Sequence, residues 1–188
     1  LRQAASQIDD LSFHLYQPRN VGYITGDRKF RNAIDRLACF ESLAREFGMG
    51  SQVVEGNFSR TSGYRGAARL LESAAKPTVI MTSSDRAALG VLSLCVERGI
   101  HVPGELSVIG YDNLYPAEDV NPSLSTVDNP ISASGKLAAE ILIAYLEGGK
   151  EWPRQEWLVT GFVVRESTGP GPGYSLESSG GDPSLGGA

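Results

Sequence analysis

The sequence predicts an α/β fold in which a parallel sheet carries helices on both faces. Short apolar, β-branched segments alternate along the chain with longer segments that have helical periodicity. The short segments are mostly apolar, which is typical of strands that are buried on both faces of a sheet. The chain has 188 residues, 41% of them hydrophobic and 21% charged, so it is able to form a sizeable core.

The chain opens on a segment with the pattern of an amphipathic helix. Residues 3–16 place apolar side chains at helical spacing, and Pro18 ends that pattern. The expected strands then follow as short runs rich in Val, Ile and Thr, at residues 21–25, 52–55, 78–82 and 106–111.

A helix is expected after each of the first three strands. The first of these helices ends at Gly48, and the second follows Thr61 or Ser62, either of which is able to cap it. The third begins near Asp85 and ends at Gly99. This alternation is the pattern of a parallel sheet with crossover helices.

The rhythm changes beyond Asp112. An irregular, Pro-containing stretch runs to Pro130 and leads into a helix that ends at Gly148 and Gly149. Residues 157–164 are expected to form a last strand. From Gly169 onward Gly, Pro and Ser dominate, which favours a flexible tail.

Polar groups follow each of the first four expected strands. In open α/β sheets, ligands bind outside the carboxyl ends of the strands, where loops and helix amino termini meet. Those ends carry amides, hydroxyls, carboxylates and one aromatic ring, which suit a polyhydroxylated or heterocyclic ligand. The alternative is that Ser84 and Asp85 cap a helix and that Asp112 ends a strand. The groups in question are Gly26-Asp27, Gly56-Asn57-Phe58, Ser83-Ser84-Asp85 and Asp112-Asn113.

Composition and motifs argue against several function classes. A net charge of -5 argues against nucleic-acid binding by this chain alone, because such binding needs clustered Lys and Arg. His14 and His101 lie far apart, and no metal or cofactor is expected. Catalysis is not expected, since the chain has no G-x-S-x-G elbow and Ser134-Gly135-Lys136 lacks the glycine of a phosphate loop.

Location follows from similar reasoning. The sequence has no apolar run long enough to span a bilayer and no signal-peptide pattern, so a cytoplasmic location is expected. Cys39 and Cys95 each fall on the apolar side of a helical pattern, which favours buried small hydrophobes over a disulfide. Because the chain begins without Met, an upstream segment is also expected.

Five motifs together resemble the effector-binding domain of the lactose-repressor (LacI/GalR) family of transcription regulators. The most specific are the strand-end Gly-Tyr-Asp-Asn, the Pro-x-Leu-x-Thr-Val element and the terminal Val-Arg-Glu-Ser-Thr. The resemblance covers about four fifths of the chain. The motifs are VGYITGD at 21–27, DRLACF at 35–40, SSDRAALGVL at 83–92, VPGELSVIGYDN at 102–113 with PSLSTV at 122–127, and VVRESTG at 163–169.

This resemblance implies a periplasmic-binding-protein-like architecture of two α/β lobes behind a helix-turn-helix and a hinge. It makes the second lobe complete here and the first lobe mostly missing. The implied divisions are a first-lobe helix remnant at 1–18, the second lobe at 19–128, a returning first-lobe helix at 129–150, the last second-lobe strand at 151–168 and a tail at 169–188.

The resemblance also assigns roles to residues. Arg36 is similar to the family arginine that donates to effector oxygens, and Asp112 to the acid that accepts from effector hydroxyls or ring nitrogens. Phe58 resembles the aromatic residue that stacks on the effector. Ser84 stands where the family usually has Asn, and Cys39 where it has Gly; neither departure identifies the ligand. The remaining residues implied to line the pocket are Ser84, Asn32, Phe30 and Asn129.

The function implied is effector sensing for a DNA-binding regulator, with a sugar or nucleoside-like metabolite as effector. Operator DNA would be bound only by the absent amino-terminal domain. A homodimer is expected through Leu89, Leu92 and Val120, although both leucines equally suit the core. The alternative function is a solute-binding protein for a sugar transporter.

Overall fold

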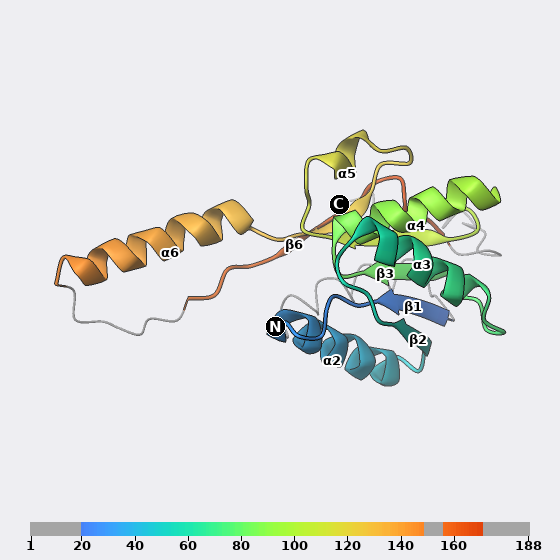
Figure 1. The fold of residues 1–188 in the computed structure, drawn as a ribbon, viewed down its shortest axis with the longest axis horizontal. Coiled ribbons are helices and arrows are strands. Elements are labelled where there is room, and N and C mark those ends of the chain that lie inside the picture. Colours follow the sequence, from blue (N-terminus) through green and yellow to red (C-terminus); the bar gives the residue numbers. More distant parts are fainter. Residues whose placement is uncertain (1–19, 149–155, 171–188) are drawn as a thin grey trace, which may run out of the picture.

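The computed structural model describes residues 20–148 and 156–170. The expected helix at 3–16, the division at 1–18 and most of the expected tail therefore lie outside the described residues. Figure 1 shows a twisted sheet with helices on either side of it and one further helix that extends away from it.

The sheet has the order β2-β1-β3-β4-β5-β6. The pairings among β1 to β5 are parallel, whereas β6 runs antiparallel to β5. The parallel part was predicted and is confirmed, and the antiparallel last strand is a difference from that prediction. The strands are β1 (Asn20–Ile24), β2 (Gly50–Val54), β3 (Val79–Thr82), β4 (Ser107–Tyr111), β5 (Ser125–Asp128) and β6 (Gly161–Val163).

Helices cover both faces of this sheet (Figure 1). α2 (Arg31–Glu46) lies on one face, and α3 (Arg60–Leu71) and α4 (Asp85–Arg98) lie on the other. Neighbouring residues of a strand point to opposite faces, and both faces of β1 are buried. Val21 and Tyr23 pack with Phe40 of α2, while Ile24 packs with the residues of α3 and α4. This arrangement explains why β1, which is covered on both faces, is apolar along its length.

Two glycines set the distance between α3 and α4. A Cβ atom at Gly63 would collide with the backbone of Ala87, and one at Gly90 would collide with the backbone of Arg60. The two helices therefore approach each other closely only because these positions have no side chain.

The structure corrects the expected start of α3. Ser59 caps this helix, since its hydroxyl accepts from the backbone N–H of Ser62 at 3.1 Å. The expected caps, Thr61 and Ser62, lie inside the first turn. The predicted ends of the other two helices are confirmed, because Gly48 and Gly99 both adopt positive φ angles.

The segment after β4 is more regular than expected. It contains the short helix α5 (Pro116–Asp119) and the strand β5, whose Ser125 and Thr126 are buried polar residues. Because Ser125 and Thr126 are polar, this strand has no hydrophobic run that would predict it. The last strand is also shorter than expected, because only Gly161–Val163 finds a partner, in β5.

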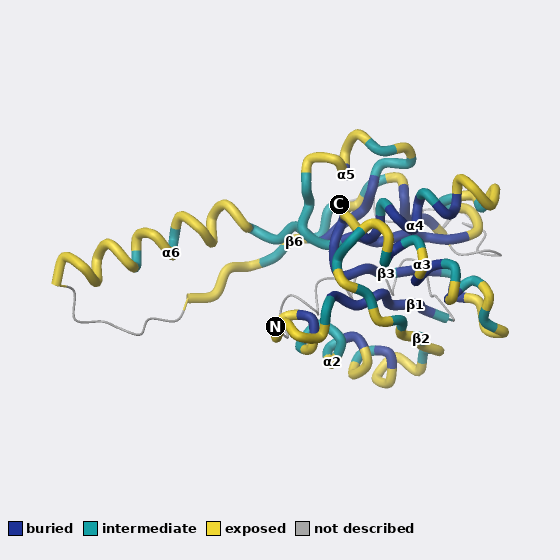
Figure 2. The backbone as a smooth tube through the Cα atoms, viewed as in Figure 1, coloured by how far each residue is buried: buried dark blue, intermediate teal, exposed yellow. Residues whose placement is uncertain are grey.

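α6 (Ile131–Leu146) differs from every other long helix. It extends away from the sheet, and Figure 2 shows it largely exposed along its length. None of its residues is buried. Within the residues that the structure describes, no helix is both long and apolar enough to cross a membrane.

Candidate functional site

Asp112 lies at the carboxyl end of β4, on the rim where the expected binding residues gather. Its backbone has a positive φ of 116°, and that of Asn113 has 53°. The side-chain amide of Asn129 donates to the Asp112 carboxylate at 3.2 Å. Burial raises the pKa of Asp112, while the Asn129 hydrogen bond and the charge of Arg36 act in the opposite direction.

Arg36 extends from α2 toward the same rim. Its guanidinium lies 3.6 Å from the centre of the Tyr111 ring, and its Nη1 donates to the carbonyl oxygen of Ser83 at 3.1 Å. These contacts fix the side chain above the ends of β3 and β4. The cation is therefore held close enough to Asp112 to affect its titration.

Phe58 follows β2 and places its ring over the end of β1. A Cβ atom at Gly26 would collide with that ring, so the close approach requires glycine at this position. Phe30 meets the Phe58 ring edge-to-face, with the ring centres 6.1 Å apart. Because Phe30 is 57% exposed, the pair forms an apolar wall that is open to solvent.

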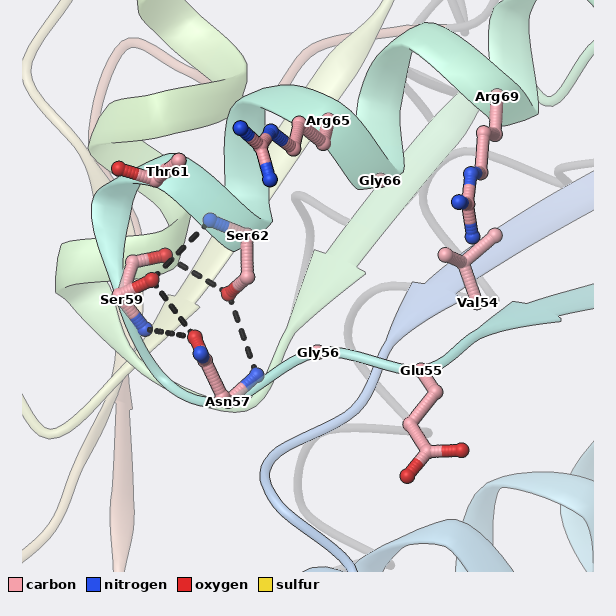
Figure 3. A pocket seen from close by; sticks show the side chains of 10 residues that line it. All are labelled: Val54, Glu55, Gly56, Asn57, Ser59, Thr61, Ser62, Arg65, Gly66 and Arg69. Atoms are coloured by element: carbon pink, nitrogen blue, oxygen red, sulfur yellow. Dashed lines mark hydrogen bonds between the residues drawn. The ribbon is translucent and has the colours of Figure 1, made fainter.

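Hydrogen bonds within the loop shape the backbone around Phe58, whose φ is 66°. The Asn57 carboxamide oxygen accepts from the backbone N–H of Ser59 at 3.2 Å and from its hydroxyl at 2.6 Å. The backbone N–H of Asn57 donates in turn to the Ser62 hydroxyl (Figure 3). A hollow of about 280 Å³ lies behind this loop, between β2 and α3. These bonds hold Phe58 in an unusual conformation.

Ser84 supports the site by hydrogen bonding to the loop that carries Phe58. Its hydroxyl donates to the carbonyl oxygen of Phe58 at 2.9 Å and accepts from the backbone N–H of Ala87, and its exposed fraction is 4%. It both caps α4 and ties the Phe58 loop to that helix. Asn32 is exposed on the first turn of α2.

Some residues of the site were missed by the sequence reasoning. Arg165 donates to the carbonyl oxygen of Leu124, to the Asn113 side chain and to Glu118. Its guanidinium thereby joins β6 to the loop that carries Asp112. The VVRESTG motif was the available signal. Tyr111, under Arg36, was recognised as the last residue of its strand and as part of the Gly-Tyr-Asp-Asn motif, but not as a contact of Arg36.

The residues expected at a dimer interface are partly in the core. Leu92 is 4% exposed and belongs to the core cluster beneath α4, so its side chain offers no surface to a second copy. Leu89 and Val120 are partly buried and pack against the same cluster. The core alternative therefore holds for Leu92, because the apolar face of α4 that contains it lies against the sheet.

The environment of Cys95 and the distribution of possible metal ligands point to structural roles. Cys95 is buried, and burial raises the pKa of its thiol to about 11, as for a small hydrophobe. Across residues 20–148 and 156–170, His, Cys, Asp and Glu side chains form no group able to hold a metal ion.

The chain is similar to bacterial regulators over most of its length. A family model described as a periplasmic binding protein-like domain matches residues 17–168. The HTH-type transcriptional repressor PurR of Escherichia coli O1:K1 is 31% identical over 157 residues, which cover 82% of this chain and 46% of that protein. The chain thus spans about half the length of the curated relatives it matches.

Solved structures agree with this assignment. A LacI family transcriptional regulator from Bifidobacterium animalis subsp. lactis superimposes with a TM-score of 0.83 at 25% identity, covering 90% of this chain and 62% of that one. A LacI transcriptional regulator from a Rhodococcus species gives a TM-score of 0.80 at 28% identity, covering 89% and 63%. The chain belongs to the periplasmic binding protein-like domain family, in the form that LacI-family transcription regulators carry.

Proposed function

We propose that this chain senses a small-molecule effector for a DNA-binding transcription regulator. The observation that carries the proposal is the gathering of Arg36, Phe58 and Asp112 on one rim of the sheet from three separate segments. Helix capping or strand termination would need no such gathering. The family relationship supports the same function, because the relatives named above are transcription regulators.

The rim suits a sugar or a nucleoside-like metabolite. Arg36 offers donors to ligand oxygens, and Asp112 accepts from hydroxyls or ring nitrogens. Phe58 and Phe30 offer an apolar face on which a ring stacks. Asn32 and Asn129 add amide groups at the margin, and Ser84 holds the Phe58 loop in place.

The rest of the effector site would be formed by a second lobe. α6 is the helix that would return through that lobe, and its exposed Leu142, Ile143 and Leu146 would pack there. An effector that binds both lobes would favour the closed arrangement, which shifts an existing equilibrium. Operator DNA would be bound by a segment outside these 188 residues, because this chain has a net charge of -5.

A solute-binding protein of a sugar transporter is the rival function, since it would use the same fold and a similar rim. The similarity to a repressor and to LacI-family structures favours the regulator. The proposal includes no chemical step on the ligand.

A homodimer is part of the proposal because a two-fold assembly suits a palindromic operator. Leu89 and Val120 remain the proposed interface residues, and Leu92 supports their surface from the core. Sedimentation of the intact regulator tests this, and a monomer at micromolar concentration would contradict it.

The effector site is tested by nuclear magnetic resonance titration of the chain with D-ribose, D-glucose, adenine and adenosine. One of these probes is expected to shift the signals of Phe30, Phe58 and Asp112. Arg36→Ala and Asp112→Ala should each weaken that binding by about 1.5–3 kcal/mol, the range for hydrogen bonds to charged groups. Arg45→Ala is the matched control, because Arg45 is exposed at the far end of the same helix. Unchanged binding in both rim variants would place the site elsewhere.

A further inference from the structure

The loop that presents Asp112 has an unfavourable backbone conformation. Asp112 and Asn113 are consecutive residues other than glycine, and both have positive φ angles, 116° and 53°. The left-handed region costs an L residue about 1–2 kcal/mol, so such a pair persists only where the surroundings hold it. Some group must therefore stabilise the backbone on either side of these residues.

Asp85 is one such group, beside the bonds from the Asp112 N–H to the Val127 carbonyl oxygen at 3.0 Å and from the Asn113 N–H to the Thr126 hydroxyl at 3.4 Å. Asp85 Oδ2 accepts from the backbone N–H of Leu114 at 2.7 Å, and its Oδ1 accepts from the Thr126 hydroxyl at 2.5 Å. The backbone N–H of Tyr111 lies near enough to lower the pKa of this carboxylate. Leu114 directly follows the two residues with positive φ, and Thr126 lies in the neighbouring β5, so one carboxylate joins the end of the loop to the sheet.

Capping of α4 does not account for Asp85. The side chain of Ser84 performs that task, by accepting from the backbone N–H of Ala87. The carboxylate of Asp85 is turned away from its own helix toward β4 and β5. It is only 1% exposed, and a buried carboxylate is costly unless donors surround it.

The strand beside Asp85 is adapted to receive it. A Cβ atom at Gly110 would collide with Asp85 Oδ1. Burial raises the pKa of Asp85, and the hydrogen bonds from Thr126, Leu114 and Tyr111 together with the charge of Arg165 oppose this rise. The strand offers a glycine that leaves room for the carboxylate, and a backbone donor and a hydroxyl are directed to it.

We propose that Asp85 is a positioning residue of the effector site, which fixes the loop at Leu114 and thereby sets the direction of Asp112. This inference rests on the proposed function for the role of Asp112. It predicts that loss of the Asp85 carboxylate increases the local opening of the loop more than that of the sheet.

The alternative is that Asp85 contributes only to overall stability, as any buried polar group does. Asn113 has independent side-chain bonds, because it accepts from Arg165 at 2.9 Å and donates to Asp128 at 3.0 Å. Those bonds hold the Asn113 side chain but leave the N–H group of Leu114 to Asp85. Exchange of that amide therefore separates the two explanations.

The test compares amide hydrogen exchange in Asp85→Asn with that in Ile80→Val, measured by magnetic resonance on the whole chain. Ile80 is fully buried in the core of β3, so its variant lowers stability without touching the loop. In Asp85→Asn the Leu114 amide should exchange about tenfold faster or more relative to the amides of β3. Ile80→Val should leave that ratio unchanged.

A second variant keeps the inference testable if Asp85→Asn fails to fold. Gly110→Ala retains the carboxylate but displaces it, and should also speed exchange at Leu114 relative to β3. An unchanged ratio in both variants, or the same change in Ile80→Val, would overturn the inference.

Ligand binding separates this inference from the proposed function. A probe that binds the wild type should bind Asp85→Asn at least about tenfold more weakly, and Ile80→Val equally well. If Asp85→Asn loosens the loop while Asp112→Ala binds the probe normally, the proposed effector site is wrong and so is the binding role given to Asp85.

Discussion

α4 and α6 are helices of similar length that behave in opposite ways. α4 buries most of its apolar side chains against the sheet, whereas α6 buries none, although its sequence is at least as apolar. In Figure 2 α4 lies largely within the dark blue, buried part of the molecule, whereas α6 extends away from it and is largely exposed. We call residues 20–128 the body and α6 the arm. An apolar helix face becomes core only where a partner surface exists.

The exposed side chains of the arm therefore indicate where a further layer of structure belongs. Leu142 is 50% exposed and Leu146 is 73% exposed, while Leu94 of α4 is 0% exposed. Exposed apolar patches of this kind mark interaction surfaces. The body and the arm should respond differently to the same substitution.

Truncation of a leucine should give the largest contrast. Leu94→Ala removes a fully buried side chain from the body and should lower the free energy of unfolding by about 2–5 kcal/mol. Leu142→Ala in the arm should change it by less than about 0.5 kcal/mol, since water already contacts that side chain. Urea unfolding of both variants measures this. Equal losses would mean that the arm is packed in solution.

Glycine substitution should give effects of opposite sign. Gly90→Ala places a methyl group against the backbone of Arg60 and should destabilise the body by about 1–3 kcal/mol. Gly135→Ala in the arm meets no atom within 4 Å and should stabilise the helix by about 0.5–1 kcal/mol. Thermal unfolding by circular dichroism distinguishes them. A stabilising Gly90→Ala would contradict the close contact between α3 and α4.

Removal of the Asp112 charge should stabilise the body at neutral pH. Burial raises the pKa of Asp112 above 3.8, so the folded state binds this proton more tightly than the unfolded chain does. The favourable contribution of that group is complete below the unfolded pKa and is lost as the pH rises through the folded pKa. Asp112→Asn should therefore raise the free energy of unfolding at pH 7, and this gain should fall as the pH is lowered.

Urea titrations of wild type and Asp112→Asn between pH 4 and pH 7 measure that gain. Glu140→Gln in the arm is the control, because Glu140 has a 59% exposed side chain. If the stability gain of Asp112→Asn over wild type instead grew as the pH was lowered, the pKa of Asp112 would be lowered by folding and the burial argument would be wrong.

Removal of a surface ion pair should change the free energy of unfolding least, and by a similar amount in the body and in the arm. Arg31–Asp35 in α2 and Lys136–Glu140 in α6 are both pairs one turn apart with an exposed cation. Arg31→Ala and Lys136→Ala should each cost about 0.3–0.5 kcal/mol and lose that effect at high salt. Chemical denaturation at low and high salt tests this. A markedly larger cost at Lys136 would indicate that the arm is shielded from solvent.

The sequence was sufficient for the elements whose signal is local. Helix ends at Gly48 and Gly99 were predicted because a residue in the left-handed conformation ends a helix, and glycine adopts it readily. The start of α3 was predicted too late, since Thr61, Ser62 and Ser59 are chemically similar candidates. Only the hydrogen bond to Ser59 distinguishes them.

For the site, the sequence placed Phe58 and Asp112 at strand ends, and the family resemblance added Arg36 on a helix, but neither gave a sign of what holds these side chains. The Arg36 cation lies over Tyr111 across 75 positions of sequence, and Asp85 reaches Leu114 across 29. Such pairings leave no periodicity in either segment. Leu92 was assigned to a surface for the same reason, because a helical pattern does not say which apolar face meets the sheet.

The sequence by itself thus determined the α/β class, the order of most elements and the edge of the sheet where polar groups collect, because these follow from hydrophobic periodicity and from the common direction of parallel strands. Only the tertiary structure decided that α4 is buried while α6 is exposed, that β6 is antiparallel, and that Asp85 supports the Asp112 loop. Burial and hydrogen bonding between distant residues depend on which surfaces meet, and no local pattern contains that information.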